Sequence, residues 1–398
     1  FHKSKTWGLY ICFEQPWKFT TKKFIFSFFL TACTSSTKNN DSGSDQGSTE
    51  PAVHRAVEVS WNEYTHPCIG NRTDALWCDD ASTCFVGCGT TTNGQGMYTT
   101  ADGGENWDSL TTSPAGLLDD MRVNSISRSS NGHLYIGGNG PGDNRVVSMD
   151  SSGNLTVEHE AQGQTWNTFQ VGSFRRADNG FAISESLTGS DIISRSNDTS
   201  NWTDHYGWWA DYNSAGLQIL DMESLGNEIY GCGSTINTPP QVMIPSADGN
   251  IFESVQLASG DNEYPGEMWG IDAHTTIIAV GGVNQGRDVG MSYHAPTSAN
   301  LSATDTWQSF DFSVVLPDKA SWVRDVCVDS DASYIAVVED AQLSEGYVFR
   351  IYDNGSSDDL TVYDGNGRTA FPVPSRCMVV NGRVVVAGKN GWFAHFDL

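Results

Sequence analysis

The sequence predicts an all-β fold in which a four-stranded antiparallel unit is repeated seven times. Short apolar runs recur between turns rich in Gly, Asn, Asp and Ser, which is typical of strands. The chain has 41 Gly and no long run rich in Ala, Glu, Lys and Leu. One apolar strand, usually ending in Gly, returns about every 50 residues, and four strands per period of this length are typical of a β-propeller blade.

This apolar strand, the second of each unit, sets the register of the repeat. Its seven copies begin at Phe85, Leu134, Phe181, Ile229, Ile277, Tyr334 and Val384. The last unit ends at Leu398 without a fourth strand, whereas an extra strand, Val57–Trp61, precedes the first unit. Because an open blade would leave a bare strand edge, we expect Val57–Trp61 to close a seven-bladed propeller over residues 57–398 as its outer strand.

The N-terminal region has the features of an export signal. Two Lys at 22 and 23 precede the apolar run Phe24–Leu30, and Leu30-Thr-Ala-Cys33 follows;. This resembles the lipobox of bacterial lipoproteins, which implies that residues 1–33 hold an upstream segment plus a signal peptide and that Cys33 is lipidated. The alternatives are an ordinary signal peptide or a chance apolar stretch. Residues 34–56 are expected to form a flexible polar tether.

The charge balance limits the partners. The chain has 22 Lys and Arg against 48 Asp and Glu, a net charge of −26. Nucleic-acid binding needs clustered cations, so this class of partner is excluded. We expect a monomer that contacts the membrane of the cell envelope only through its lipid, and a cationic or neutral partner, either a protein or a glycan.

A turn motif recurs between the third and fourth strands. Its best copy reads Thr100-Ala-Asp102-Gly-Gly104-Glu-Asn-Trp107, and partial copies contain Ser148 and Asp150, then Asp248 and Phe252. An Asp side chain can accept hydrogen bonds from turn N–H groups, while Gly permits a positive φ. The motif resembles the Asp-box, or bacterial neuraminidase repeat, in which these residues stabilise the turn and take no part in catalysis.

Two families with such blades suggest different functions. The blades resemble those of the photosystem II stability and assembly factor family, since Trp269 and Trp322 open inner strands and Phe85–Gly89 precedes the Asp-box. That resemblance implies a non-enzymatic scaffold. Sialidases are the enzymatic case, but their Phe/Tyr-Arg-Ile-Pro motif is matched only by Phe349–Tyr352, in the sixth unit and with Tyr in place of Pro. We therefore predict no catalytic residues.

Acidic residues on the expected inner strands raise the question of a cation. Asp221, Asp272 and Asp325 should face the central channel, with Asp79 as a further candidate. Converging carboxylates suit Ca²⁺, although acids that only line a wet channel are the simpler interpretation. No Cys or His spacing typical of zinc occurs. We predict no cofactor and no metal, with Ca²⁺ as the alternative.

Aromatic residues supply the candidate binding surface. The loop between the third and fourth units holds Tyr206, Trp208, Trp209 and Tyr212, and Trp269 belongs to a second cluster. Such residues either bind a partner or sugar, or pack between blades.

Seven cysteines follow Cys33, so at least one should stay unpaired. Disulfides are permissible in an exported protein. Cys68 and Cys78 form our expected pair, and Cys327 and Cys377 occupy the same position in adjacent units.

The sequence therefore favours a non-enzymatic scaffold, anchored to the envelope, whose propeller loops bind a protein partner. The alternative is a carbohydrate-binding protein or glycosidase with sialidase-like architecture. Fold resemblance alone does not decide between them.

Overall fold

The computed structural model describes residues 52–398 with several gaps, and for 170–219 it describes only the backbone of strands. The gaps are 69, 71–72, 90–93, 111, 120, 130–131, 140–143, 161–169, 178–179, 188–189, 197–202, 206–217, 227, 235–238, 246–251, 258–265 and 362–369. Within this part of the chain, no helix has the length and apolar character needed to cross a bilayer.

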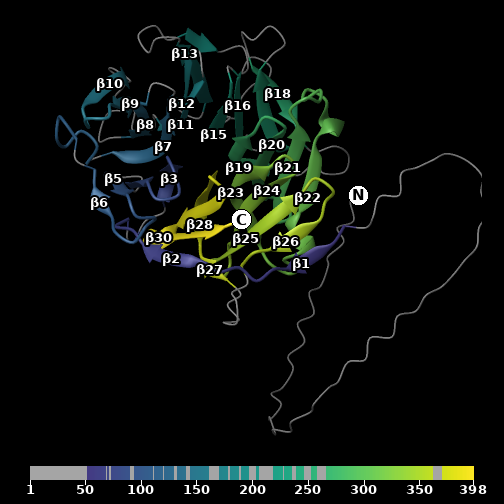
Figure 1. Cartoon of the computed structure of the whole chain (residues 1–398). Helices are drawn as coiled ribbons and strands as arrows, with labels where there is room; N and C mark the ends of the chain where they lie inside the picture. Colours follow the sequence, from purple (N-terminus) through teal and green to yellow (C-terminus); the bar gives the residue numbers. More distant parts are fainter. Residues whose placement is uncertain are drawn as a thin grey trace, which may run out of the picture. The chain divides into compact units, whose positions relative to one another are not determined.

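The described strands form six sheets around a central axis (Figure 1). The first sheet contains β3 (Thr73–Cys78), β4 (Cys84–Gly89), β5 (Gly94–Thr100) and β6 (Asp108–Ser109). The second contains β7 (Arg122–Arg128), β8 (Leu134–Asn139), β9 (Asn144–Met149) and β10 (Leu155–Glu160). The third contains β11 (Gln170–Ala177), β12 (Gly180–Leu187), β13 (Ser190–Ser196) and β14 (Thr203–His205).

The fourth sheet has eight strands, twice as many as each of the first three. Its first half holds β15 (Gln218–Leu225), β16 (Glu228–Ser234), β17 (Gln241–Pro245) and β18 (Phe252–Gln256). Its second half holds β19 (Gly266–Ala273), β20 (Ile277–Asn284), β21 (Val289–Pro296) and β22 (Gln308–Asp311). Two short 3₁₀ turns, η1 (Thr304–Thr306) and η2 (Phe312–Val314), flank β22.

The remaining two sheets include strands from near the start of the described chain. The fifth contains β23 (Ser321–Ser330), β24 (Ser333–Asp340), β25 (Glu345–Tyr352) and β26 (Ser357–Asp359), with β27 (Phe371–Pro372) beside β25 and β1 (His54–Ala56) beside β26. The sixth contains β28 (Pro374–Val380), β29 (Arg383–Gly388), β30 (Trp392–Asp397) and β2 (Asn62–Thr65), with the 3₁₀ turn η3 (Lys389–Gly391) between β29 and β30.

The chain is thus an all-β propeller with four-stranded antiparallel blades, but the prediction of seven separate blades is wrong. Hydrogen bonding gives six sheets, because Ser234 of β16 pairs with Glu267 of β19. This contact merges the two four-stranded units that contain β15–β18 and β19–β22 into one eight-stranded sheet. The sequence pattern shows the periodicity of the units but carries no signal for a single backbone contact between two of them.

The N-terminal strands also differ from the prediction. Residues 57–61 do not form the outer strand. Instead β2, which follows them, pairs antiparallel with β30 from Asn62–His395 to Thr65–Trp392. The preceding β1 runs parallel to β26 of the neighbouring sheet. Trp61 lies between these two strands as a buried side chain, and its indole N–H donates to the carbonyl of Leu360 at 2.8 Å. The N-terminal segment therefore contacts two neighbouring sheets.

Every inner strand has the same irregularity. A β-bulge interrupts the pairing of the first and second strands of each four-stranded unit, for example between Met268 and Gly270 on β19 and between Val323 and Asp325 on β23. A bulge bends the strand and increases its twist. The bulges lie where the inner strands β3, β7, β11, β15, β19, β23 and β28 contact one another in order around the axis.

The recurrent Gly of the second strand has a packing reason. A Cβ on Gly87 would lie 2.5 Å from the Cγ1 of Val123, and a Cβ on Gly281 would lie 2.5 Å from the Cγ1 of Val323. In both cases the Val belongs to the next inner strand, so only Gly allows it to approach this closely.

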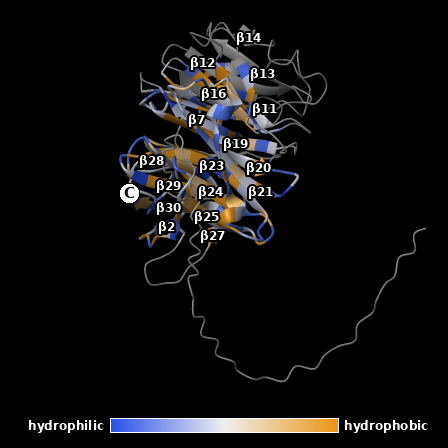
Figure 2. Ribbon diagram, turned by 90° about the vertical axis from the view of Figure 1, so that its right-hand side faces the viewer, coloured by the Kyte–Doolittle hydropathy of each residue, from blue (hydrophilic) through white to orange (hydrophobic). Residues whose placement is uncertain are grey.

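Buried apolar side chains fill the spaces between sheets. All eight residues of β20 and of β24 are buried, which is typical of strands covered on both faces;. Tyr334, Phe312 and Phe349 are among the largest fully buried side chains, and each contributes on the order of 2 kcal/mol through the hydrophobic effect;. Figure 2 shows hydrophobic and hydrophilic residues interspersed along the strands.

Candidate functional site

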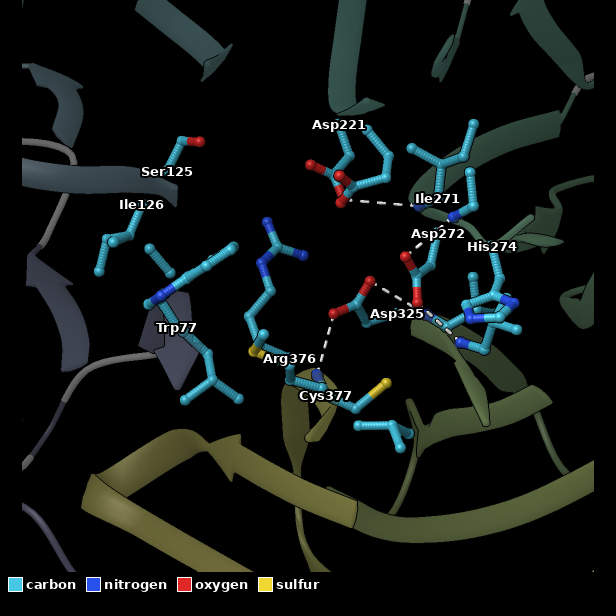
Figure 3. Close-up of a pocket in the computed structure, with 18 of the residues that line it drawn as sticks. Trp77, Ser125, Ile126, Asp221, Ile271, Asp272, His274, Asp325, Arg376 and Cys377 are labelled. Carbon is cyan, nitrogen blue, oxygen red and sulfur yellow. Dashed lines mark hydrogen bonds between the residues drawn. The ribbon is translucent and has the colours of Figure 1, made fainter. Parts of the chain in front are cut away.

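A cavity of about 240 Å³ lies on the propeller axis. Its described walls come from six inner strands, β3, β7, β15, β19, β23 and β28, and from the turn after β19. Among the described residues, the carboxylates of Asp221, Glu223, Asp272 and Asp325 line it, together with the guanidinium of Arg376. Figure 3 shows Asp221, Asp272, Asp325 and Arg376 in the same space, although they come from four different strands.

The three Asp side chains bind neighbouring inner strands to one another. Asp221 on β15 accepts a hydrogen bond from the backbone N–H of Ile271 on β19 at 3.4 Å. Asp272 on β19 accepts one from Val328 on β23 at 2.7 Å.

Asp325 continues this series. It accepts a hydrogen bond from Cys377 on β28 at 2.9 Å. Each of the three acids therefore connects its strand to the next one around the ring (Figure 3).

Each of these carboxylates also accepts a bond from the residue that follows it. The donors are the N–H groups of Met222, Ala273 and Val326, at 3.0, 2.8 and 3.0 Å respectively. Hydrogen bonds from N–H groups stabilise the ionised carboxylate and fix its orientation. The acids are therefore held in place before any ligand arrives.

Burial changes the protonation of one member of this group. Burial raises the pKa of Asp325 to about 7, while Arg376 opposes the rise and Asp221 adds to it. The cavity charge consequently depends on pH near neutrality. Cys232 of β16 is a buried thiol that forms no disulfide, and its pKa is raised first by burial and then by Asp221 and Asp325.

Asp79 does not belong to this cavity. It follows β3 and forms an ion pair with Arg128 of β7, with Nη2 at 2.6 Å from the carboxylate. It also accepts a bond from the indole N–H of Trp77 at 2.8 Å. Asp79 therefore links the first two sheets at their surface and does not join Asp221, Asp272 and Asp325.

Trp269 lies at the bulge of β19 and packs within the protein. Its ring meets that of Trp322 edge to face, with centroids 5.7 Å apart, and the guanidinium of Arg324 lies over both rings at 4.5 and 4.8 Å. Arg324 also forms an ion pair with the buried Glu339. Trp269 thus belongs to a partly buried cluster with Trp322 and Arg324, and its role in binding a partner stays a prediction. The other predicted aromatic residues, Tyr206, Trp208, Trp209 and Tyr212, lie outside the described residues, as does Cys33.

The turn after β5 shows how its motif is built. The side chain of Asp102 accepts bonds from the backbone N–H and the side-chain amide of Asn106, at 3.0 and 2.8 Å, and from the hydroxyl of Thr100 at 2.8 Å. These bonds lower the pKa of Asp102 to about 2. Trp107 donates to the carbonyl of Gly104 at 3.0 Å and packs edge to face on Phe393 of the last sheet.

The turn after β9 repeats this geometry. Asp150 accepts bonds from the backbone N–H and the side-chain amide of Asn154, at 2.9 and 2.8 Å, and these bonds lower its pKa. The buried Ser148 occupies the position of Thr100. In the fourth unit, Asp248 lies outside the described residues and Phe252 begins β18.

The disulfides differ from the expected pairing of Cys68 with Cys78. Cys78 pairs with Cys84, because the β3–β4 hairpin places these two residues opposite each other. Cys68, which follows β2, pairs with Cys88 of β4. Cys327 and Cys377, at equivalent positions of β23 and β28, form the third disulfide.

Two residues of the cavity lacked a clear sequence signal. Glu223 lies two positions after Asp221 on the same strand, a spacing that directs both side chains to one face. Arg376 follows the bulge of β28 as Asp325 follows that of β23. Aligning the inner strands on their bulges, rather than on the second strands, would have placed both residues at the axis.

Comparisons with known proteins give the fold but no family. No protein-family model and no curated protein matches the sequence. Among solved structures, YCF48 bound to a D1 peptide is similar with a TM-score of 0.58 and 13% identity, over 87% of this chain and 99% of that chain. The RRP9 WD40 repeats are similar with a TM-score of 0.57 and 10% identity, over 87% of this chain and 100% of that chain.

A third similar structure is the extracellular domain of the putative hybrid two-component system BT4673 from B. thetaiotaomicron. Its TM-score is 0.56 at 11% identity, over 84% of this chain and 39% of that chain. At these identities the likeness concerns the fold alone. The likeness to YCF48 agrees with the predicted resemblance to the photosystem II assembly factor family at the level of the propeller.

Proposed function

We propose that this propeller is a protein-binding scaffold whose axial cavity receives a basic side chain, or a short basic segment, of its partner. The observation that carries the proposal is the composition of the described lining, in which the carboxylates of Asp221, Glu223, Asp272 and Asp325 outnumber the one described guanidinium, that of Arg376. A cavity with this excess of carboxylates suits a Lys or Arg side chain by charge and by hydrogen bonding.

Two properties of the protein favour such a partner. The net charge of −26 attracts cationic segments at long range and accelerates their association;. The backbone hydrogen bonds to Asp221, Asp272 and Asp325 hold the carboxylates in place, so binding costs little side-chain entropy;.

The comparison with solved structures is consistent with binding of this kind. YCF48, a propeller of similar architecture, was solved with a bound D1 peptide. We propose that this chain also binds a protein segment. We further propose that lipidated Cys33 and a tether that ends before β1, and so is shorter than the expected 34–56, attach the scaffold to the cell envelope, which places its partner there as well.

A crosslinking pull-down tests the proposal. The bait is residues 34–398 in envelope extract, compared with the charge-reversal variant Glu223→Lys. The matched control is Glu228→Lys, which makes the same charge change at an exposed position of the same hairpin. We expect a stoichiometric protein partner that the wild type and Glu228→Lys capture and that Glu223→Lys captures at least about tenfold less, the ratio that 1.4 kcal/mol produces.

Two outcomes would contradict the proposal. Equal capture of the partner by Glu223→Lys and Glu228→Lys would show that the binding site lies outside the cavity. Capture of glycan without protein would favour the alternative of a carbohydrate-binding protein or glycosidase, and hydrolase assays would follow.

A further inference from the structure

A cluster of metal-ligand side chains lies at the junction of the first and last sheets, apart from the axial cavity. Among the described residues, one group of at least three His, Cys, Asp or Glu has ligand atoms close enough to hold an ion, namely His66, Cys68 and Cys88. Their ligand atoms lie within 4.8 Å of one another, and all three residues are buried, with exposed fractions of 1%, 0% and 0%.

Hydrogen bonds fix the state of the His66 ring. The hydroxyl of Thr73 donates its proton to the carbonyl of Gly388 at 3.0 Å, so it must accept at its 3.0 Å contact with Nε2 of His66. Nε2 therefore carries the proton. Nδ1 is then the unprotonated nitrogen, in agreement with its acceptance of a 3.3 Å bond from the backbone N–H of Cys68, a bond that a metal ion at Nδ1 would replace. Fixing one imidazole nitrogen by a hydrogen bond is how proteins prepare the other as a metal ligand.

We propose that this cluster is a redox-dependent zinc site, in which His66, Cys68 and Cys88 bind Zn²⁺ once the Cys68–Cys88 disulfide is reduced. In the oxidised protein the two sulfurs are bonded to each other and the site is closed.

The chemistry requires a dithiol reductant. The reductant transfers two electrons and two protons to the disulfide, which becomes two thiols while the dithiol becomes a disulfide. Zn²⁺ then displaces the two thiol protons and binds two thiolates and Nδ1 of His66. Two sulfurs at Zn–S distances of about 2.3 Å in a tetrahedral site lie roughly 3.8 Å apart, within the range that the cluster spans. The fourth position is left to water or another small ligand.

The charge of such a centre suits its surroundings. One Zn²⁺ and two thiolates are neutral together, so burial of the complex avoids the cost of an uncompensated charge. The ligand set of two Cys and one His is among those that zinc uses when it keeps one position open.

The position of the cluster means that the bond between Cys68 and Cys88 connects two separate parts of the chain. Cys68 follows β2, the outer strand of the last sheet, and Cys88 lies in β4 of the first sheet. The disulfide therefore attaches the connection between β2 and β3 to the first sheet. Under reducing conditions, zinc would replace this crosslink by another.

Zinc titration of the full chain tests the proposal. The protein is reduced with a phosphine, which is then removed without air, and Zn²⁺ is titrated against a chromophoric chelator. Co²⁺ serves as the spectroscopic probe of a sulfur-containing tetrahedral site. We expect one Zn²⁺ per reduced chain at this site, none in the oxidised chain, and at least about tenfold weaker binding in His66→Gln, comparable to the loss of a supporting ligand contact.

The matched control uses another disulfide of the same sheet. Cys78 and Cys84 also lie at 2% and 1% exposure, but neither belongs to the described ligand cluster. The double variant Cys78→Ser/Cys84→Ser should therefore keep the zinc affinity, whereas Cys68→Ser and Cys88→Ser should lose it.

Two results of the zinc titration would overturn the proposal. The first is equal zinc affinity in His66→Gln and in the wild type, and the second is loss of zinc binding in the Cys78→Ser/Cys84→Ser variant. If a Cys variant fails to fold, X-ray absorption of the wild-type zinc complex decides instead. One nitrogen and two sulfur ligands support the site, and a shell without nitrogen refutes it.

Discussion

At the scale of single residues, short-range hydrogen bonds set the conformation of the turns at the propeller rim. Thr100 accepts a bond from the N–H of Gly104 at 3.0 Å while donating to Asp102. Gly104 has a φ of +106°, and a Cβ there would lie 2.7 Å from the ring of Phe393. The turn therefore needs both the hydroxyl of Thr100 and the missing side chain of Gly104.

The first prediction concerns the buried Thr100. Thr100→Val keeps the shape of the side chain but leaves the N–H of Gly104 without its acceptor. We expect a loss of about 1–3 kcal/mol in the free energy of unfolding, measured by urea titration. Thr156→Val, on the exposed face of β10, is the control and should change stability by less than about 0.5 kcal/mol;. Equal effects of the two substitutions would show that the hydroxyl of Thr100 has no special role.

The second prediction concerns the pH dependence of stability. Burial lowers the pKa of His66 from 6.5 to about 4. The unfolded chain therefore takes up a proton below pH 6.5 while the folded chain resists it. The contribution of His66 is complete above pH 6.5 and is lost as the pH falls toward 4, by about 3 kcal/mol at most.

His66→Gln isolates this effect from other titrating groups. Urea unfolding of the oxidised wild type and variant at pH 7 and pH 4 should show that their difference in stability shrinks at the lower pH. A difference that stays constant between the two pH values would contradict the assignment of His66 as a neutral buried ring.

At the scale of elements, the ring is closed by β2 and not by the segment before it. The pairing of β2 with β30 adds a fourth strand to the last sheet, and the indole N–H of Trp392 donates to the carboxylate of Glu63 at 2.7 Å. By contrast, the three residues of β1 are exposed, and Arg55 there pairs with the largely buried carboxylate of Asp358.

The third prediction compares two truncations. A chain that begins at residue 58 loses β1 and leaves the largely buried Asp358 without Arg55 but with its bond from Tyr352, which should cost about 1–3 kcal/mol;. A chain that begins at residue 67 also loses β2 and the buried Trp61, and loss of a buried Trp alone costs roughly 3–5 kcal/mol. Thermal unfolding should show a far larger fall in Tm for the second chain. Similar values would mean that β2 does not close the ring.

The same elements show what the sequence could and could not predict. The alternation of apolar runs and turns was enough to predict four-stranded units, because each strand has its own local signal. The exact closing strand was not predictable, because Val57–Trp61 is more apolar than Asn62–Thr65 and both lie near the same edge. Tertiary contacts, including burial of Trp61 between sheets, decided between them.

The cavity shows the same division between local and tertiary signals. Asp221, Asp272 and Asp325 could be placed at the axis from their position in the repeat. Their bonds to the next inner strand could not be foreseen, because they depend on the bulges that bring Ile271, Val328 and Cys377 within reach. The prediction of the Cys68 pairing failed for a related reason, since Cys88 comes near Cys68 only through the β3–β4 pairing, in which Thr73 lies opposite Cys88.

At the scale of the whole molecule, one disulfide joins two sheets, one attaches the connection between β2 and β3 to β4, and one lies within a hairpin. Cys327–Cys377 closes a loop of 50 residues and Cys68–Cys88 one of 20, whereas Cys78–Cys84 closes one of 6. In the chain-entropy account, a longer loop gives more stabilisation because it restricts the unfolded chain more strongly.

The fourth prediction follows from these loop lengths. Cys327→Ser/Cys377→Ser should cost about 4 kcal/mol and Cys78→Ser/Cys84→Ser about 2 kcal/mol. Denaturant unfolding of the oxidised proteins measures both values. If both double variants lost the same stability, or the Cys78/Cys84 variant lost more, loop length would not determine how much each disulfide stabilises the fold.

The charge of the axial cavity links the whole molecule to its proposed function. Since the pKa of Asp325 lies at about 7, the cavity loses part of its negative charge as the pH falls through neutrality. A basic ligand should therefore bind more weakly at pH 6 than at pH 8, and more weakly at high salt than at low salt.

The most direct test measures peptide binding to the folded chain at pH 8 by fluorescence anisotropy. Two labelled peptides of equal length are compared, one rich in Lys and one rich in Glu, against wild type, Glu223→Lys and the control Glu228→Lys. We predict that the basic peptide alone binds, and that Glu223→Lys weakens it at least about tenfold while Glu228→Lys does not. Equal binding of both peptides, or equal effects of both substitutions, would contradict a cavity that recognises a basic partner.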